Sequence, residues 1–355
     1  MPRPIPDRSP TGGLTAALHS PARLSTGDTM PSTHRSFMPR HAARLLAAFL
    51  LPIAAFAQDS YPAKPVQIIV SWAAGGSIDT MARGFARAMS QELGQPVVVE
   101  NRDGASGMRG TAATVSAPPD GYVLNFGPIT PITNALHLMS KPAYGVDSLE
   151  YVCQVFENRF AIAVPQNSPY KTLQDLYAAI QASPGKLSYG HLGVGSITHL
   201  SLETAIQGRG FSVTGVPYRG ETPMFLDLQT ARLDFGVVTV GSTLATSRPV
   251  RMLAIISDRR HPEIPDVPTL KELGLPSLQP ALVGLMAPRA TPAPVLAKLE
   301  RACKNAVKTD VMQAAVKMLR DEIVYKDRKA FTASVMRDYE EKGALVKRLA
   351  IPAQN

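Results

Sequence analysis

The chain has 355 residues, of which 37 are Lys or Arg and 28 are Asp or Glu, giving a formal net charge of +9. Residues 1–57 hold six arginines and two aspartates, so the rest of the chain carries about +5. This weak charge, with no run of Lys and Arg, argues against nucleic-acid binding and is compatible with attraction of small carboxylates. Only two cysteines are present and no His or carboxylate cluster has metal-ligand spacing, so we expect no metal and no cofactor.

The N-terminal region has the three-part layout of a secretory signal peptide. A short basic segment, Met38–Arg44, precedes the apolar run Leu45–Phe56, which is too short to span a membrane. Ala55-Phe56-Ala57 forms a small-x-small cleavage signal. We therefore expect cleavage near 57/58 and export of the mature protein to the periplasm.

Residues 1–37 are rich in Pro, Ser, Thr and Arg and show no apolar period, which indicates an over-extended start. Met30 or Met38 is then the true initiator. No Cys follows the cleavage site, so no lipid anchor is expected there, and no later apolar run is long enough for a transmembrane helix. The mature protein is expected to be soluble.

The first strand of the mature chain ends in a glycine turn. Val66–Val70 is apolar and β-rich, Gly75-Gly76 follows, and a helical pattern begins at once. Glycines let backbone N–H groups approach a ligand, and the helix behind them adds a positive dipole end. Ser77 and Asp79 stand in the first helical turn, where a polar side chain caps the helix or contacts a ligand. The turn predicts capture of a small organic anion, and an ordinary glycine-containing turn is the alternative.

Strand and helix patterns then alternate along the chain. Seven apolar residues at three- and four-residue spacing predict one buried helix face: Ile78, Met81, Ala82, Phe85, Ala86, Met89 and Leu93. The later elements are predicted as a buried strand at Val97–Val99, a helix at 107–117, a strand at Tyr122–Phe126, a short helix near 131–140, an extended segment Tyr151–Pro165, alternating strands and helices over 172–256, an extended segment Ala281–Pro288 and a mostly helical remainder. In the last helix one stripe includes Lys342, whose charge is expected to reach water along its apolar stem.

These patterns predict an α/β protein with two lobes. A mature chain of about 300 residues exceeds what one compact core usually holds. Repeated βα units predict parallel sheets covered on both faces, and the two extended segments predict two crossings between two sheets. We assign residues 58–159 and 284–355 to lobe 1 and residues 160–283 to lobe 2, with a central cleft between them.

The second lobe has a glycine loop of its own, Tyr189–Leu200, placed between a short strand and a helix. It lacks the Gly-Lys-Ser/Thr ending of a phosphate-binding loop and the acidic ribose partner of a dinucleotide site. Two anion-binding turns that face each other across a cleft form a more specific signal than either alone. Ser196 and His199 suggest an exported hydrolase as an alternative. We expect no catalytic residue, because neighbours on one helix rarely align as nucleophile and base.

Individual residues have competing interpretations. Trp72 belongs either to the core or to the cleft wall. Asp79 either contacts an amino group of the ligand or caps its helix, and Arg83 is spaced to pair with it. Cys153 and Cys303 could form a disulfide in an oxidising compartment. The favoured interpretation is that Cys303 is a small buried hydrophobe in an apolar helix stripe.

The chain resembles the Bug/TctC family, the extracytoplasmic solute receptors of tripartite tricarboxylate transporters, over nearly all of residues 60–351. The matching motifs are Tyr61–Val66, Ala74–Asp79 with Ala82-Arg83, Val98–Gly107, Pro119–Tyr122, Gly193–Ser196 with His199-Leu200, Val216–Gly220 and Pro265–Thr269. Three positions depart from the family pattern: Ser71 replaces a usual Pro, His191 replaces a usual small residue, and Asp227–Ala231 replaces a Gly-Gly turn.

The resemblance implies a type II periplasmic-binding fold, a Venus flytrap that closes on a small carboxylate. It implies a non-catalytic, monomeric protein that delivers its ligand to a membrane permease of the tripartite type; a ligand-loaded sensor for a signalling partner is an alternative. The ligand-binding residues it implies are Ala74, Gly75, Gly76, Ser77 and Asp79 in lobe 1 and Gly193, Gly195, Ser196 and Tyr218 in lobe 2. We add Trp72 and Thr130 in lobe 1 to the expected ligand-binding residues.

Overall fold

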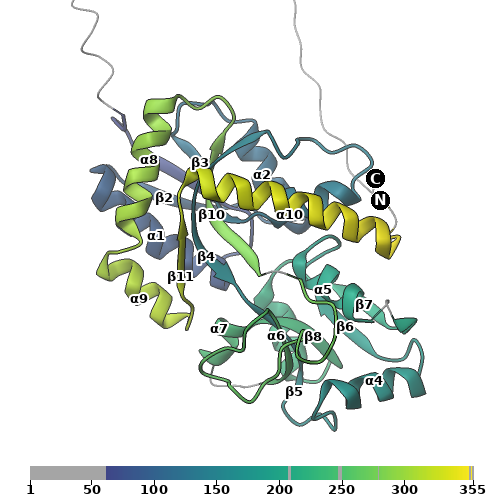
Figure 1. Ribbon diagram of the computed structural model, residues 1–355. Helices are drawn as coiled ribbons and strands as arrows, with labels where there is room; N and C mark the ends of the chain where they lie inside the picture. The colour runs from purple at the N-terminus through teal and green to yellow at the C-terminus, as the bar shows by residue number, and fades with distance from the viewer. Residues whose placement is uncertain (1–60, 207–208, 247–249, 279, 352, 354–355) are drawn as a thin grey trace, which may run out of the picture. The chain divides into compact units, whose positions relative to one another are not determined.

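The structure is a computed structural model (Figure 1), and it describes residues 61–206, 209–246, 250–278, 280–351 and 353. All of these belong to one compact unit, Gln58–Asn355. The signal peptide, the preceding extension and the cleavage site near 57/58 lie outside the described residues. Across the ranges that are described, no helix combines the length and the apolar character needed to cross a membrane.

The first lobe is built on a six-stranded sheet with the strand order β11-β4-β10-β3-β1-β2. Its strands are β1 (Val66–Val70), β2 (Val97–Asn101), β3 (Val123–Pro128), β4 (Leu149–Asn158), β10 (Ala281–Pro288) and β11 (Ile323–Lys326). β1 pairs in parallel with β2 and β3, whereas β10 is antiparallel to both β3 and β4. The helical elements of this lobe are α1 (Ser77–Leu93), η1 (Ala105–Gly107), α2 (Met108–Val115), α3 (Thr130–Thr133), η2 (Ala135–Leu138), α8 (Ala293–Ala306), α9 (Asp310–Met318) and α10 (Arg328–Leu349).

α1 forms where the apolar period predicts it. All seven predicted apolar residues are buried, and α1 packs against α8 and α9. The helix ends at Gly94, whose left-handed conformation (φ 67°) lets its N–H donate to the carbonyl of Ser90. The packing and the Gly94 cap therefore fix α1 against the C-terminal helices of the first lobe.

The second lobe is built on a five-stranded sheet with the order β7-β6-β8-β5-β9. Its elements are β5 (Phe160–Pro165), α4 (Leu173–Ala182), β6 (Ser188–His191), α5 (Ile197–Ile206), β7 (Thr214–Pro217), α6 (Glu221–Gln229), β8 (Phe235–Thr239), α7 (Val240–Leu244) and β9 (Val250–Ile256). β6 is parallel to β7 and β8, whereas β5 is antiparallel to β8 and β9. Both lobes thus combine a parallel βαβ part with antiparallel strands.

The two sheets are joined by crossing strands. β4 in the first sheet leads directly into β5 in the second, and the chain returns from β9 to β10. The extended segments Tyr151–Pro165 and Ala281–Pro288 are confirmed. The predicted parallel pairing is confirmed for the strands of the βα units, whereas the strands that cross between the lobes run antiparallel to their neighbours. The division expected at 283/284 falls inside β10, whose pairing with β4 begins at Ala281.

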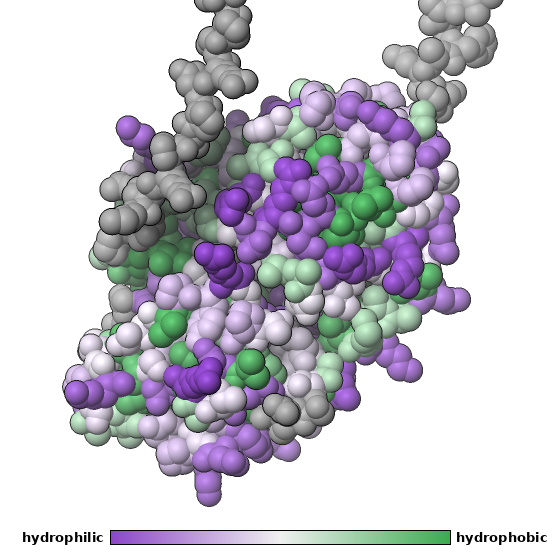
Figure 2. Space-filling view, turned by 180° about the vertical axis from the view of Figure 1, so that it is seen from behind, coloured by the Kyte–Doolittle hydropathy of each residue, from purple (hydrophilic) through white to green (hydrophobic). Residues whose placement is uncertain are grey.

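Two further expectations are corrected by packing. β2 lies at the edge of its sheet, and Val98 is 55% exposed, so this strand is not buried. Lys342 does not reach water: its side chain is buried, and its Nζ lies 2.9 Å from Asp338 Oδ1 one turn earlier on α10. On the face seen in Figure 2, polar and hydrophobic residues are interspersed, as on many folded proteins.

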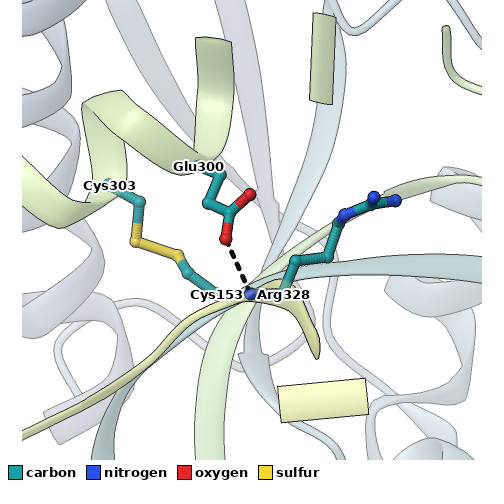
Figure 3. Close-up of a disulfide and its surroundings, with 4 residues drawn as sticks. All are labelled: Cys153, Glu300, Cys303 and Arg328. Atoms are coloured by element: carbon teal, nitrogen blue, oxygen red, sulfur yellow. Dashed lines mark hydrogen bonds between the residues drawn. A yellow bond between two sulfur atoms is a disulfide. The ribbon is translucent and has the colours of Figure 1, made fainter. Parts of the chain in front are cut away.

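Cys153 and Cys303 form a disulfide, contrary to the favoured interpretation of Cys303 as an isolated buried thiol. Figure 3 shows the bond joining β4 to α8, next to Glu300, which accepts a hydrogen bond from the backbone N–H of Arg328 at 3.0 Å. The two cysteines are 150 residues apart in the chain. The bond therefore ties the crossing strand to a C-terminal helix within the first lobe.

Candidate functional site

A cavity of about 80 Å³ lies between the two sheets, lined by residues of both lobes. From the first lobe it receives six of the predicted site residues: Trp72, Ala74, Gly76, Ser77, Asp79 and Thr130. From the second lobe Ser196 is the one predicted residue that lines it, together with the unpredicted Leu192, Ile197 and Glu221. The first βα turn and the loop after β6 therefore meet at one cavity.

Helix N-termini converge on this cavity. α1 begins at Ser77, α5 at Ile197 and α6 at Glu221, and all three residues line its wall. Within the part of the chain that the structure describes, no side chain forms a cap hydrogen bond at the start of α1 or of α6. Among the described residues that line the cavity there is no Lys or Arg. Uncapped N–H groups and the positive dipole ends of the helices thus provide its attraction for an anion.

Asp79 holds the glycine turn in place. Its carboxylate accepts hydrogen bonds from the N–H of Gly75 at 3.0 Å, from Arg83 Nε at 3.0 Å and from Asn101 Nδ2 at 2.9 Å. Asn101 also donates to the carbonyl of Trp72, which ties β2 to the same turn. Burial raises the pKa of Asp79, but these hydrogen bonds and the Arg83 charge outweigh it and hold the pKa below its ordinary value. The geometry thus favours a structural role for Asp79, which fixes the glycine turn ahead of α1 with Arg83 as its partner.

Trp72 lines two cavities. On one side lies the cavity just described, and on the other a larger one of about 650 Å³ that is lined by Gly193 and Tyr218. The hydroxyl of Tyr218 donates to Asp227 at 2.7 Å, and burial together with this hydrogen bond raises the pKa of Tyr218 to about 12. Two of the predicted site residues, Gly193 and Tyr218, thus lie beside the second cavity rather than the first.

Gly75 and Gly195 line neither cavity. Both have positive φ, 85° and 80°, so glycine there serves the shape of the loop. A Cβ on Gly195 would lie 3.2 Å from the Cα of Ala135, which places this loop directly against the first lobe.

Ser196 and His199 are not arranged as a nucleophile and its base. The Ser196 hydroxyl donates to the carbonyl of Gly193 at 2.7 Å and accepts from the backbone N–H of His199. The His199 ring instead accepts from the N–H of Gly195 at 3.4 Å and lies 3.7 Å from Glu203. Burial, followed by the neighbouring His191, lowers the pKa of His199 to about 4. Ser196 acts as the cap of α5, and His199 packs within the second lobe.

Glu221 and Asn158 are among the cavity residues that were missed from the sequence. Glu221 follows the Val216–Gly220 motif, and its role depends on Ser77, which is 144 residues away in the chain. Asn158 ends β4 at the crossing, within the polar run Glu157-Asn158-Arg159 of the extended segment. That polar run is the one signal in the sequence that could have pointed to Asn158.

The family model described as "Tripartite tricarboxylate transporter family receptor" matches residues 81–351. A UPF0065 protein of Agrobacterium vitis, from the ttuE-ttuC' intergenic region, is 38% identical over 275 residues, which cover 76% of this chain and 79% of that protein.

Solved structures agree with this relationship. The periplasmic binding protein BugD matches with a TM-score of 0.78 and 29% identity, covering 83% of this chain and all of that one. MatC of Rhodopseudomonas palustris, solved with bound malate, matches with a TM-score of 0.74 and 28% identity, covering 81% of this chain and all of that one. The fold is the two-lobed, type II periplasmic-binding fold, and the chain belongs to the TctC family of tripartite tricarboxylate transporter receptors.

Proposed function

We propose that this protein binds a small organic carboxylate in the cavity between its lobes and delivers it, in the periplasm, to a membrane permease of the tripartite type. The observation that carries the proposal is the convergence of the α1, α5 and α6 N-termini on one cavity, whose described lining residues include no Lys or Arg. Backbone N–H groups at helix N-termini suit a carboxylate without a salt bridge. The malate bound by MatC is a ligand of this chemical class.

Contacts between the lobes lie at this cavity and beside the larger one. The Ser77 hydroxyl donates to Glu221 at 3.1 Å, and the Ser106 hydroxyl donates to the carbonyl of Val194 at 2.7 Å. A small apolar cluster of Leu138, Leu200 and Val346 also joins α10 and η2 to α5. A ligand enters when these contacts separate and is enclosed when they form again, so binding shifts the population toward the closed state.

The first test is binding. Mass spectrometry of the ligand that stays bound through native purification identifies its chemical class. The ligand-free protein is then titrated with that compound. Trp72 is the single Trp of the chain and lines the cavity, so its fluorescence should change in a saturable way. Solution scattering should give a smaller radius of gyration on binding. Tight binding without this decrease would reject closure, and a purified ligand with no acidic group would reject the carboxylate.

Gly76→Val provides a variant directed at the cavity wall. Gly76 has φ −83° and ψ 175°, which any residue adopts, and a Cβ there would meet no atom closer than 3.9 Å. The fold should therefore survive, while the added methyl groups obstruct the approach of the ligand to the N-terminus of α1. We expect unchanged far-UV circular dichroism and a loss of ligand affinity of at least about ten-fold, or about 1.4 kcal/mol. Unchanged affinity would place the ligand elsewhere.

A further inference from the structure

Glu221 brings a negative charge into the wall of the cavity. It is the first residue of α6, and three donors hold its carboxylate in position. Ser77 donates to Oε2 at 3.1 Å, while the Ser242 hydroxyl at 2.6 Å and the Thr239 N–H at 3.3 Å donate to Oε1. A carboxylate has about four acceptor positions. One position therefore remains on Glu221 for a donor supplied from the cavity.

Asn158 gives an independent indication of the same kind. It is 4% exposed, it lines the cavity, and its Oδ1 has no hydrogen-bond donor among the described residues. Buried polar atoms are nearly always hydrogen-bonded in folded proteins, so an acceptor without a donor at a cavity wall points to a donor on the ligand. Asn158 comes from the crossing strand β4 and Glu221 from the second lobe, so the two observations arise from separate parts of the chain.

The cavity therefore combines two kinds of recognition. Helix N-termini favour a carboxylate, whereas Glu221 and Asn158 favour a hydrogen-bond donor, above all a cationic one. We propose that the ligand is a small amino carboxylate whose ammonium group is bound by Glu221 and Asn158. This rests on the proposed function and names its substrate class. A dicarboxylate would bring its second negative charge toward Glu221, so we expect that repulsion to make it bind more weakly than the amino carboxylate.

The size of the cavity agrees with a small ligand. A volume of about 80 Å³ corresponds to roughly five to eight water-sized groups, at about 10–15 Å³ each. A small amino acid has a comparable number of non-hydrogen atoms. The other interpretation of Glu221 is that it only stabilises the start of α6 and joins the lobes through Ser77, and the experiment distinguishes the two.

The test uses ligands matched in shape. The proteinogenic amino acids are screened by thermal shift, and the best binder is compared by calorimetry with its hydroxy and deamino analogues, as in L-alanine, L-lactate and propionate. Succinate and L-malate represent dicarboxylates. Each titration is repeated with Glu221→Gln, which keeps the size of the side chain and an acceptor for Ser242. Glu340→Gln is the control, because Glu340 is exposed on α10 and the change in net charge is the same.

We expect the wild type to bind the amino carboxylate at least about ten-fold more tightly than its deamino analogue, and Glu221→Gln to abolish that preference. Glu340→Gln should behave as the wild type. Failure of every amino acid to bind, or an unchanged preference in Glu221→Gln, overturns the proposal. Tight binding of lactate, malate or succinate by both proteins would reject the ammonium subsite but retain the proposed function. Failure of every carboxylate would reject the proposed function itself.

Discussion

Replacing Asp79 with Asn tests how the glycine turn is held. Asn has nearly the same shape as Asp, but one carboxylate oxygen becomes an NH₂ group that cannot accept the hydrogen bonds from Gly75 and Arg83. The side chain of Asp79 is 5% exposed, so water replaces these hydrogen bonds poorly. Hydrogen bonds to charged groups contribute about 1.5–3 kcal/mol each, and their losses here overlap. We expect Asp79→Asn to lower the free energy of unfolding by about 3 kcal/mol.

Urea unfolding, followed by far-UV circular dichroism at neutral pH, measures this loss. Asp266→Asn is the control, because Asp266 is exposed and its substitution should change the unfolding midpoint little. The folded-state pKa of Asp79 is lowered, so its contribution is present above the ordinary pKa of 3.8 and is lost as the pH falls through the lower folded value. The difference in the free energy of unfolding between the wild type and Asp79→Asn should therefore become smaller below about pH 4. Equal midpoints for wild type and Asp79→Asn at neutral pH would refute this account of the turn.

Three further predictions follow from residues away from the cavity. Cys153→Ala/Cys303→Ala should lose about 3–5 kcal/mol of stability in urea, because the disulfide closes a segment of 150 residues; an equal effect of dithiothreitol on the double variant and the wild type would contradict it. Lys342→Met should cost about 3–5 kcal/mol by leaving Asp338 buried without its cation, and Lys342→Met/Asp338→Leu should recover most of that stability; a double variant no more stable than the single one would show that the pair is not the cause. Intact-mass analysis of periplasmic protein should give an N-terminus near Gln58, and a product that retains residues 1–37 would reject the signal-peptide interpretation.

Local patterns alone determined much of the fold. The apolar period of α1 is a property of 17 consecutive residues, and each of its predicted apolar residues is buried. The two glycine turns were likewise found where they occur, because each lies between a strand and a helix that are adjacent in sequence. The two extended crossing segments could be recognised for the same reason. Motifs at the expected spacing then led to the family and to the type II fold.

Tertiary structure decided which of those residues meet. Gly75 and Gly76 are neighbours in the same motif, yet only Gly76 lines the cavity, since the backbone of the turn directs the two differently. Cys153 and Cys303 are joined because β4 and α8 pack together, which their separate sequence patterns do not encode. Ser77 and Glu221 are far apart in the chain, and they are in contact only because the two sheets pack next to each other. Such contacts depend on the relative placement of whole elements, and a pattern confined to one helix or strand carries no information about that placement.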